Sequence, residues 1–178
     1  LGVLGRHNTM NALAVAATSW VMGIPGQKVT DGVKAFHGAG RRMEYKGEYR
    51  GAKVYDDYAH HPDELRATLE AVRGMGDHRI VLAFQPHTYT RTKLLMDDFI
   101  RELKKADVVV LAEIYAARES NTIGISSADL AAQIPGSIYC ETLQDVTETL
   151  RRIVKEGDIV VTMGAGDIFR AGEALLAE

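Results

Sequence analysis

Residues 53–84 read KVYDDYAHHPDELRATLEAVRGMGDHRIVLAF: a short β-rich run, an amphipathic helical run and a second, apolar run. The middle run predicts a helix over Pro62–Arg73, because Leu65, Leu69 and Val72 recur at helical spacing and Pro62 is suited to the first helical position. The last run, 80–84, is apolar at every position, as in a strand covered on both faces. This succession predicts a βαβ unit with two parallel strands and a helical crossover.

The same alternation continues to the end of the chain. Further strands are expected within residues 107–114, 137–140 and 158–163, and further helices at Lys93–Lys105, Ser127–Ile134, Leu143–Lys155 and Asp167–Leu176. Repeated strand-helix units favour helices on both faces of one sheet. We therefore predict an α/β fold, a Rossmann-like, doubly wound and mostly parallel sheet.

The first 55 residues have a different pattern. Two helices are expected, at Asn8–Met22 and Gln27–Phe36, and an antiparallel hairpin is expected within Met43–Tyr55, around Lys46-Gly47-Glu48. A boundary near Gly38–Arg42 would divide a helical appendage, 1–39, from the sheet domain, 40–178. Because the sequence starts at Leu1 and leads straight into a helical pattern, we expect a piece of a longer chain.

The composition is that of an ordinary globular protein, with 46% hydrophobic and 25% charged residues among 178. It excludes a disordered or collagen-like chain. The net charge of -3, with no basic run longer than a pair, argues against a nucleic-acid or anionic-membrane partner. No apolar run approaches the roughly 20 residues of a membrane span. The single cysteine, Cys140, favours a reducing cytoplasm.

Polar residues gather in the loops that follow the predicted parallel strands. These loops are Asp56–Pro62, Gln85–Arg91, Glu113–Glu119 and Gly164–Asp167. In a parallel sheet the carboxyl ends of the strands meet at one side, where ligands bind in open α/β folds. We therefore expect a ligand site there.

The first of these loops, Asp56–Pro62, carries residues with more than one possible role. Asp56 and Asp57 cap the helix that begins at Pro62, or are solvated carboxylates of a turn, or accept hydrogen bonds from a ribose. His60 and His61 either lead into that helix or supply a proton acceptor for an amine. A metal site is not expected, because adjacent histidines rarely share one ion and no further ligand stands at zinc spacing.

Several arginine and glycine positions also have more than one possible role. Arg91, four residues after His87, is either a surface residue or a bidentate partner for a carboxylate. The pair Arg41-Arg42 is either solvated or placed to reach a phosphate between two domains. Gly164–Gly166 lacks the third glycine of a dinucleotide fingerprint, which favours tight packing, and the chain has no P-loop sequence.

Near the N-terminus, Asn8 and Asn11 stand three residues apart on one face of a predicted helix. Capping explains only Asn8, whereas an asparagine side chain can pair with an adenine edge. Six ordered motifs, taken together, resemble the bacterial Mur ligases: HNxxNA at 7–12, the stretch 36–42, DDYAHHP at 56–62, FQPHTYTRT at 84–92, EIYAARE at 113–119 and GAGDI at 164–168.

The resemblance implies an ATP- and Mg²⁺-dependent ligase of peptidoglycan synthesis that joins L-alanine to UDP-N-acetylmuramate through an acyl phosphate. It implies that residues 1–39 are the truncated tail of a central ATPase domain and 40–178 a complete C-terminal domain. The N-terminal and central domains would then be partners outside this chain, together with the P-loop and most Mg²⁺ ligands. No ligase activity is expected of the 178 residues alone.

For the nucleotide, the resemblance implies that Asn8 and Asn11 contact adenine, with His7 beside the nucleoside. Asp57 would bind the ribose, and Arg42 would reach the terminal phosphate.

For the amino acid, the resemblance implies a pocket of Tyr58, His60, His87 and Arg91. Arg91 would hold the carboxylate and His60 would lie near the amine, so that His60 and Arg42 are the catalytic candidates. Thr88 stands where relatives often have arginine. Two rival functions remain: a Rossmann-like binding module without chemistry, and a structural or interaction domain.

Overall fold

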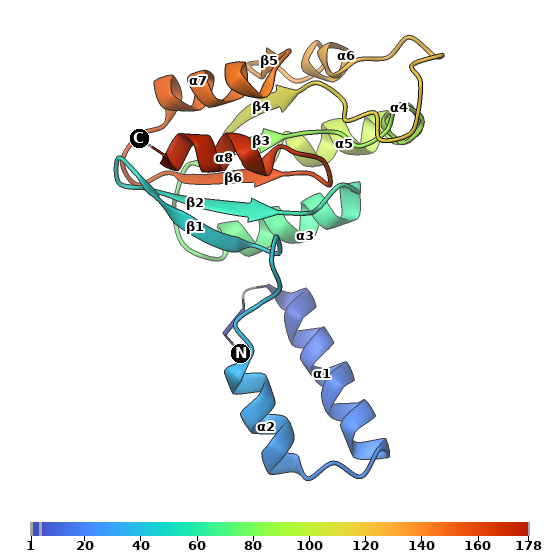
Figure 1. Ribbon diagram of the computed structural model, residues 1–178, viewed down its shortest axis with the longest axis vertical. Coiled ribbons are helices and arrows are strands. Elements are labelled where there is room, and N and C mark those ends of the chain that lie inside the picture. Colours follow the sequence, from blue (N-terminus) through green and yellow to red (C-terminus); the bar gives the residue numbers. More distant parts are fainter. Residues whose placement is uncertain (1, 4, 178) are drawn as a thin grey trace.

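The computed structural model describes residues 2–3 and 5–177, which form a six-stranded sheet with a two-helix appendage (Figure 1). The strands lie in the order β1-β2-β6-β3-β4-β5. Only β1 is antiparallel to its neighbour, so the predicted mostly parallel sheet is confirmed. The strands are β1 (Glu44–Tyr49), β2 (Ala52–Asp57), β3 (Ile80–Phe84), β4 (Val108–Ala112), β5 (Ile138–Cys140) and β6 (Ile159–Met163).

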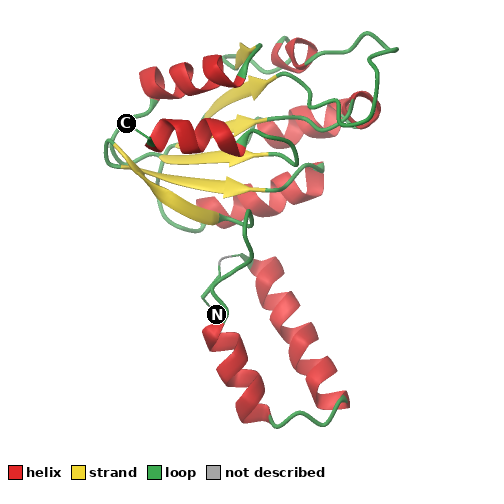
Figure 2. Ribbon diagram, viewed as in Figure 1, coloured by secondary structure: helices red, strands yellow, loops and turns green. Residues whose placement is uncertain are grey.

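Helices cover both faces of the sheet, as in a doubly wound fold (Figure 2). Side chains alternate along a strand, so Leu82 faces one cluster of buried residues and Val81 the other. The helices on the Leu82 face include α3 (Pro62–Arg73), α5 (Met96–Leu103) and α6 (Ser127–Ala131), and those on the Val81 face are α7 (Leu143–Ile153) and α8 (Phe169–Leu176).

Helix α3 begins and ends where its sequence pattern predicts. Its N-cap is His61, whose ring nitrogen accepts from the Asp63 backbone, while Glu64 accepts from the His61 backbone. This reciprocal capping satisfies two of the free N–H groups at the helix start. The helix places the preceding loop, 58–61, directly beyond the carboxyl end of β2.

The other predicted helices differ from the structure by at most three residues at an end, but two predicted elements differ in their form. The helix expected at Lys93–Lys105 is split into α4 (Tyr89–Leu94) and α5, because the chain leaves helical geometry at Leu95, which packs against the core. The hairpin turns at Arg50-Gly51 rather than at Lys46–Glu48. Both turn residues have positive φ, as a type I′ turn requires, and Gly47 instead lies at a register shift within β1.

The appendage consists of α1 (Arg6–Val21) and α2 (Gly26–Ala35), which pack on each other and stand away from the sheet (Figures 1 and 2). The base of α1 contacts α3. Much of the apolar surface of α1 faces solvent, and Trp20 is 85% exposed. Among the described residues, no helix is both long and apolar enough to cross a bilayer.

Candidate functional site

The loops after β2, β3, β4 and β6 converge at one side of the sheet, called here the carboxyl rim (residues 58–61, 85–88, 113–119 and 164–168). The ring of His60 lies 5.5 Å from that of Tyr58 and 5.7 Å from that of His87. The ring of His87 in turn stacks on Tyr115, at 5.7 Å. Residues from three loops, well separated in sequence, therefore form one cluster.

Two polar atoms of this cluster are buried without a hydrogen-bond partner: Nδ1 of His87 and Nη1 of Arg91. Leaving a buried polar atom unpaired costs about 1 to 3 kcal/mol. Burial lowers the pKa of His87, and the nearby His60 and Arg91 lower it further. An anionic ligand such as a carboxylate would pair with Arg91 and offset this accumulation of positive charge.

Asp56 and Asp57, at the end of β2, are both buried, and neither caps α3. Asp56 accepts from Thr162 and pairs with Arg41, each at 2.8 Å. Asp57 accepts from the backbone of Ala59 and of Met43, at 2.8 and 2.9 Å. Burial raises the pKa of Asp57, although these two hydrogen bonds oppose the rise. The capping interpretation of the two aspartates is therefore wrong.

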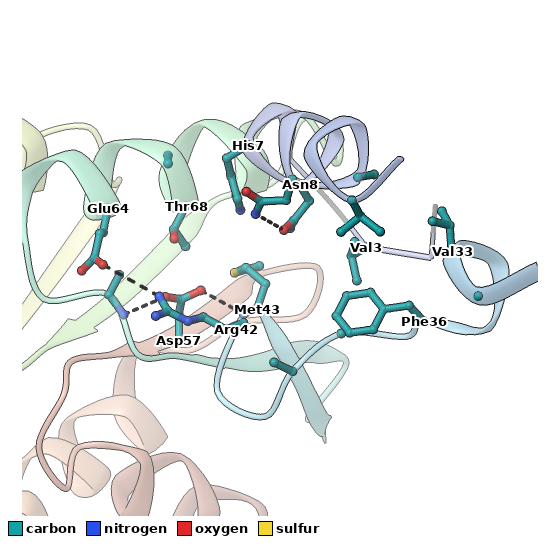
Figure 3. Close-up of a pocket in the computed structure, with 18 of the residues that line it drawn as sticks. Val3, His7, Asn8, Val33, Phe36, Arg42, Met43, Asp57, Glu64 and Thr68 are labelled. Atoms are coloured by element: carbon teal, nitrogen blue, oxygen red, sulfur yellow. Dashed lines mark hydrogen bonds and ion pairs between the residues drawn. The ribbon is translucent and has the colours of Figure 1, made fainter. Parts of the chain in front are cut away.

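A second site lies between the appendage and the sheet domain. It is a cavity of about 930 Å³, called here the appendage cavity, and its lining includes all five of the predicted nucleotide contacts: His7, Asn8, Asn11, Arg42 and Asp57 (Figure 3). Apolar residues such as Val3, Phe36 and Met43 complete its walls. The sequence prediction thus selected residues that the tertiary structure brings together.

The donor set of the appendage cavity fits a nucleoside. The side-chain amide of Asn11 donates to that of Asn8 at 3.4 Å, so the two amides lie side by side at one end. Arg42 pairs with Glu64 at 3.9 Å, and its side chain is 53% exposed, so solvent and an incoming phosphate can still reach the guanidinium. Within residues 2–3 and 5–177, no group of three or more histidine, cysteine or carboxylate side chains is arranged to hold a metal ion.

The sequence assigned no role to two residues of the carboxyl rim, Tyr115 and Gln85, or to Arg41, which contacts the rim. Tyr115 forms one wall of the aromatic cluster. Gln85 accepts from the backbone of Asp167 and Ile168 and thereby ties β3 to the turn after β6. Arg41 is half-buried beneath the rim, where it contacts Asp56 and two backbone carbonyls. The only sequence signal for Arg41 was its place in the pair before β1.

The tight-packing interpretation of Gly164–Gly166 is confirmed. A Cβ atom on Gly166 would lie 2.6 Å from the Tyr115 ring, and one on Gly164 would lie 2.7 Å from the Gln85 carbonyl. The turn therefore approaches the aromatic cluster more closely than any larger residue would allow.

Comparison with known proteins identifies the family. Residues 41–166 match the family described as Mur ligase, glutamate ligase domain. The chain belongs to the Mur ligase family. It is 47% identical over 180 residues to the UDP-N-acetylmuramate--L-alanine ligase of Lachnospira eligens, a match that covers 99% of this chain and 39% of that protein. It is 43% identical over 182 residues to the ligase of that name from Caldanaerobacter subterraneus subsp. tengcongensis.

Solved structures of Mur ligases agree with this membership. The UDP-N-acetylmuramate-alanine ligase of Thermotoga maritima superposes with a TM-score of 0.81 at 28% identity, over 98% of this chain and 38% of that one. The folylpolyglutamate synthase of Mycobacterium tuberculosis, at 20% identity and a TM-score of 0.70, shares the fold. This Mur ligase chain spans about two fifths of the length of the curated relatives that it matches.

Proposed function

We propose that this chain is the C-terminal part of an ATP-dependent ligase that joins L-alanine to UDP-N-acetylmuramate in peptidoglycan synthesis. Membership of the Mur ligase family and the names of relatives over 40% identical support the reaction. The observation that carries the proposal is that the segment Asp57–His60 contributes residues to both the appendage cavity and the aromatic cluster. Asp57 lines the appendage cavity, and the neighbouring Tyr58 and His60 belong to the aromatic cluster.

In this proposal the appendage cavity receives the nucleoside of ATP. Asn8 and Asn11 contact the adenine edge beside His7, Asp57 accepts from the ribose, and Arg42 reaches the terminal phosphate. ATP supplies the phosphoryl group that activates the carboxylate of UDP-N-acetylmuramate, with Mg²⁺ held mostly by residues outside this chain. Arg42, which pairs with Glu64 at the edge of this cavity, then stabilises the terminal phosphate by its positive charge.

The amino acid occupies the aromatic cluster. Arg91 and His87 bind its carboxylate through nitrogen atoms that are otherwise unpaired. Tyr58 lies beside the amine, and His60 accepts the proton that the amine must lose as the amide forms. Holding the amine in one orientation beside the activated carboxyl group also contributes to the rate.

Residues 1–39 are, in this proposal, the tail of the central ATPase domain, and 40–178 are the C-terminal domain. The exposed apolar side chains of α1, including Trp20 and Val21, support this division, because such a surface favours cover by another part of a longer chain. The single buried cysteine, Cys140, is consistent with a reducing cytoplasm as the place of the reaction.

The test is alanine-dependent phosphate release by the full-length enzyme with ATP and UDP-N-acetylmuramate. We expect His60→Ala and Arg91→Ala to lower kcat/KM for alanine by about 100-fold or more, since each loses a charge-assisted contact or a proton acceptor. Arg152→Ala, on the exposed side of α7, is the matched control and should keep wild-type rates.

Two results would contradict the proposal. A full-length protein that binds nucleotide without alanine-dependent turnover would favour a binding module. Unchanged rates in both His60→Ala and Arg91→Ala would favour a structural role for the cluster. The 178-residue chain alone should release no phosphate.

A further inference from the structure

Arg41 makes more contacts than any role assigned so far requires. Its Nε pairs with buried Asp56 at 2.8 Å, and its two terminal nitrogens donate to the carbonyls of Gly166 and Gly164 at 3.2 and 2.7 Å. All three nitrogen groups of the guanidinium are therefore used. They connect the end of β2 to the turn after β6.

Aromatic rings enclose the same guanidinium. Its central carbon lies 4.9 Å from the ring centre of Tyr58 and 4.6 Å from that of Phe169, within the range of cation–π contact. The backbone carbonyl of Arg41 also accepts from the Tyr58 backbone at 2.7 Å. Tyr58, the proposed neighbour of the amine, is thus held by both the main chain and the side chain of Arg41.

The backbone of Arg41 adopts a left-handed conformation, with φ of 56°. A non-glycine residue persists in this conformation only where its surroundings stabilise it. Here the Arg41 backbone N–H donates to Glu44 at 2.7 Å, in addition to the side-chain contacts. The chain direction fixed at Arg41 sets where the next residue, Arg42, enters the appendage cavity.

We propose that Arg41 is a positioning residue for the amino-acid substrate: it fixes Tyr58 and the Gly164–Gly166 turn at the carboxyl rim. This inference rests on the proposed function. Arg41 itself does not touch the substrate, because its donors are already engaged within the chain. Its planar guanidinium can donate in three directions within one plane while its faces stack on two rings. A lysine ammonium is a compact point charge, so it cannot reach these spread acceptors and stack between the rings at the same time.

The chain contains a matched control. Arg79, before β3, pairs with Asp158 through two nitrogens at 2.9 and 2.6 Å and donates to the Ile153 carbonyl at 2.8 Å. Arg79 resembles Arg41 in having a buried aspartate and a carbonyl as partners, but it lies at the opposite ends of the strands. Replacing either arginine by lysine removes a comparable network.

The experiment compares Arg41→Lys and Arg79→Lys in the full-length enzyme, with KM and kcat measured separately for alanine, ATP and UDP-N-acetylmuramate. For Arg41→Lys we expect KM for alanine to rise about tenfold, because displacing a binding group by a fraction of an ångström weakens the contacts that it orders. KM for ATP should change less, since Asp57 has its own two backbone contacts. Arg79→Lys should lower the melting temperature to a similar extent and leave all three KM values unchanged.

The inference would be overturned if Arg41→Lys and Arg79→Lys had the same KM for alanine. It would also be overturned if Arg41→Lys lowered kcat and left KM for alanine unchanged. If Arg41→Lys does not fold, Phe169→Leu decides, because it removes one of the two flanking rings and leaves Arg41 in place. It should raise KM for alanine about threefold, and an unchanged KM would contradict the inference. A wild-type enzyme without alanine-dependent turnover would instead refute the proposed function.

Discussion

At the amino-terminal ends of β3 and β6, Arg79 and Asp158 form an ion pair with two hydrogen bonds. After the carboxyl end of β3, by contrast, His87 and Arg91 each bury a nitrogen that has no partner. The amino-terminal ends of the strands, called here the amino rim, thus satisfy these charges within the chain. The carboxyl rim leaves donors free for a ligand.

Two aspartates show the same difference. A hydrogen bond from Arg73 lowers the pKa of Asp107, at the amino rim, whereas burial raises the pKa of Asp57, at the end of β2. At the amino rim, the folded chain therefore favours the charged form of Asp107. At the carboxyl end of β2, burial disfavours the charged form of Asp57 in spite of its two backbone hydrogen bonds, and a pKa raised in this way is typical of a binding site.

The largest expected effect is on stability at the amino rim. Asp158→Ala should lower the free energy of unfolding by about 3 kcal/mol, because Arg79 and the Lys155 backbone N–H lose a buried acceptor. Urea unfolding followed by circular dichroism measures this loss, with Glu156→Ala, an exposed neighbour, as control. A change below about 1 kcal/mol, the range typical of a surface pair, would remove the distinction between the rims.

Arg91→Met should weaken substrate binding and leave the stability of the fold nearly unchanged. Its free energy of unfolding should stay within about 1 kcal/mol of the wild type, because the removed Nη1 has no partner in the folded chain. In the full-length enzyme KM for alanine should rise about 100-fold, which corresponds to about 3 kcal/mol of lost binding. Stability falling as far as in Asp158→Ala would mean that Arg91 serves the fold.

A smaller difference should appear in the pH dependence of stability. Because the pKa of Asp107 is lowered from 3.8, its contribution is present above that pH and is lost as the pH falls through the lowered value. The difference in unfolding free energy between wild type and Asp107→Asn should therefore shrink in acid. The effect is modest, since the Arg73 and Asp107 side chains are 41% and 38% exposed. A difference that stays constant down to pH ~2 would contradict this assignment.

The smallest expected effect is on the titration of His87, followed by NMR. Binding of L-alanine should raise the pKa of His87, because a carboxylate beside the ring favours its protonated form. Arg91→Met should also raise it, since a nearby positive charge is removed. Ethylamine, which has the amine but no carboxylate, is the control. A rise with ethylamine equal to that with L-alanine would argue against a carboxylate site.

Local patterns in the sequence were sufficient to predict most of the helices and strands and the class of fold. Helix α3 begins at Pro62 and ends at Arg73 as its pattern predicts, because helical spacing and capping are interactions between residues close in sequence. Continuously apolar strands predicted a mostly parallel sheet covered on both faces, because a strand that is buried on both sides has apolar residues at every position. The motifs also identified residues that line the appendage cavity and the aromatic cluster.

The way in which these parts meet follows from long-range packing. It placed β6 between β2 and β3, split the helix expected after residue 93 and moved the hairpin turn to Arg50-Gly51. It also gave Arg41 partners 15 to 125 residues away, which no local spacing encodes. Such contacts depend on the packing of the whole sheet, because a side chain's burial and its partners follow from segments that are distant in sequence.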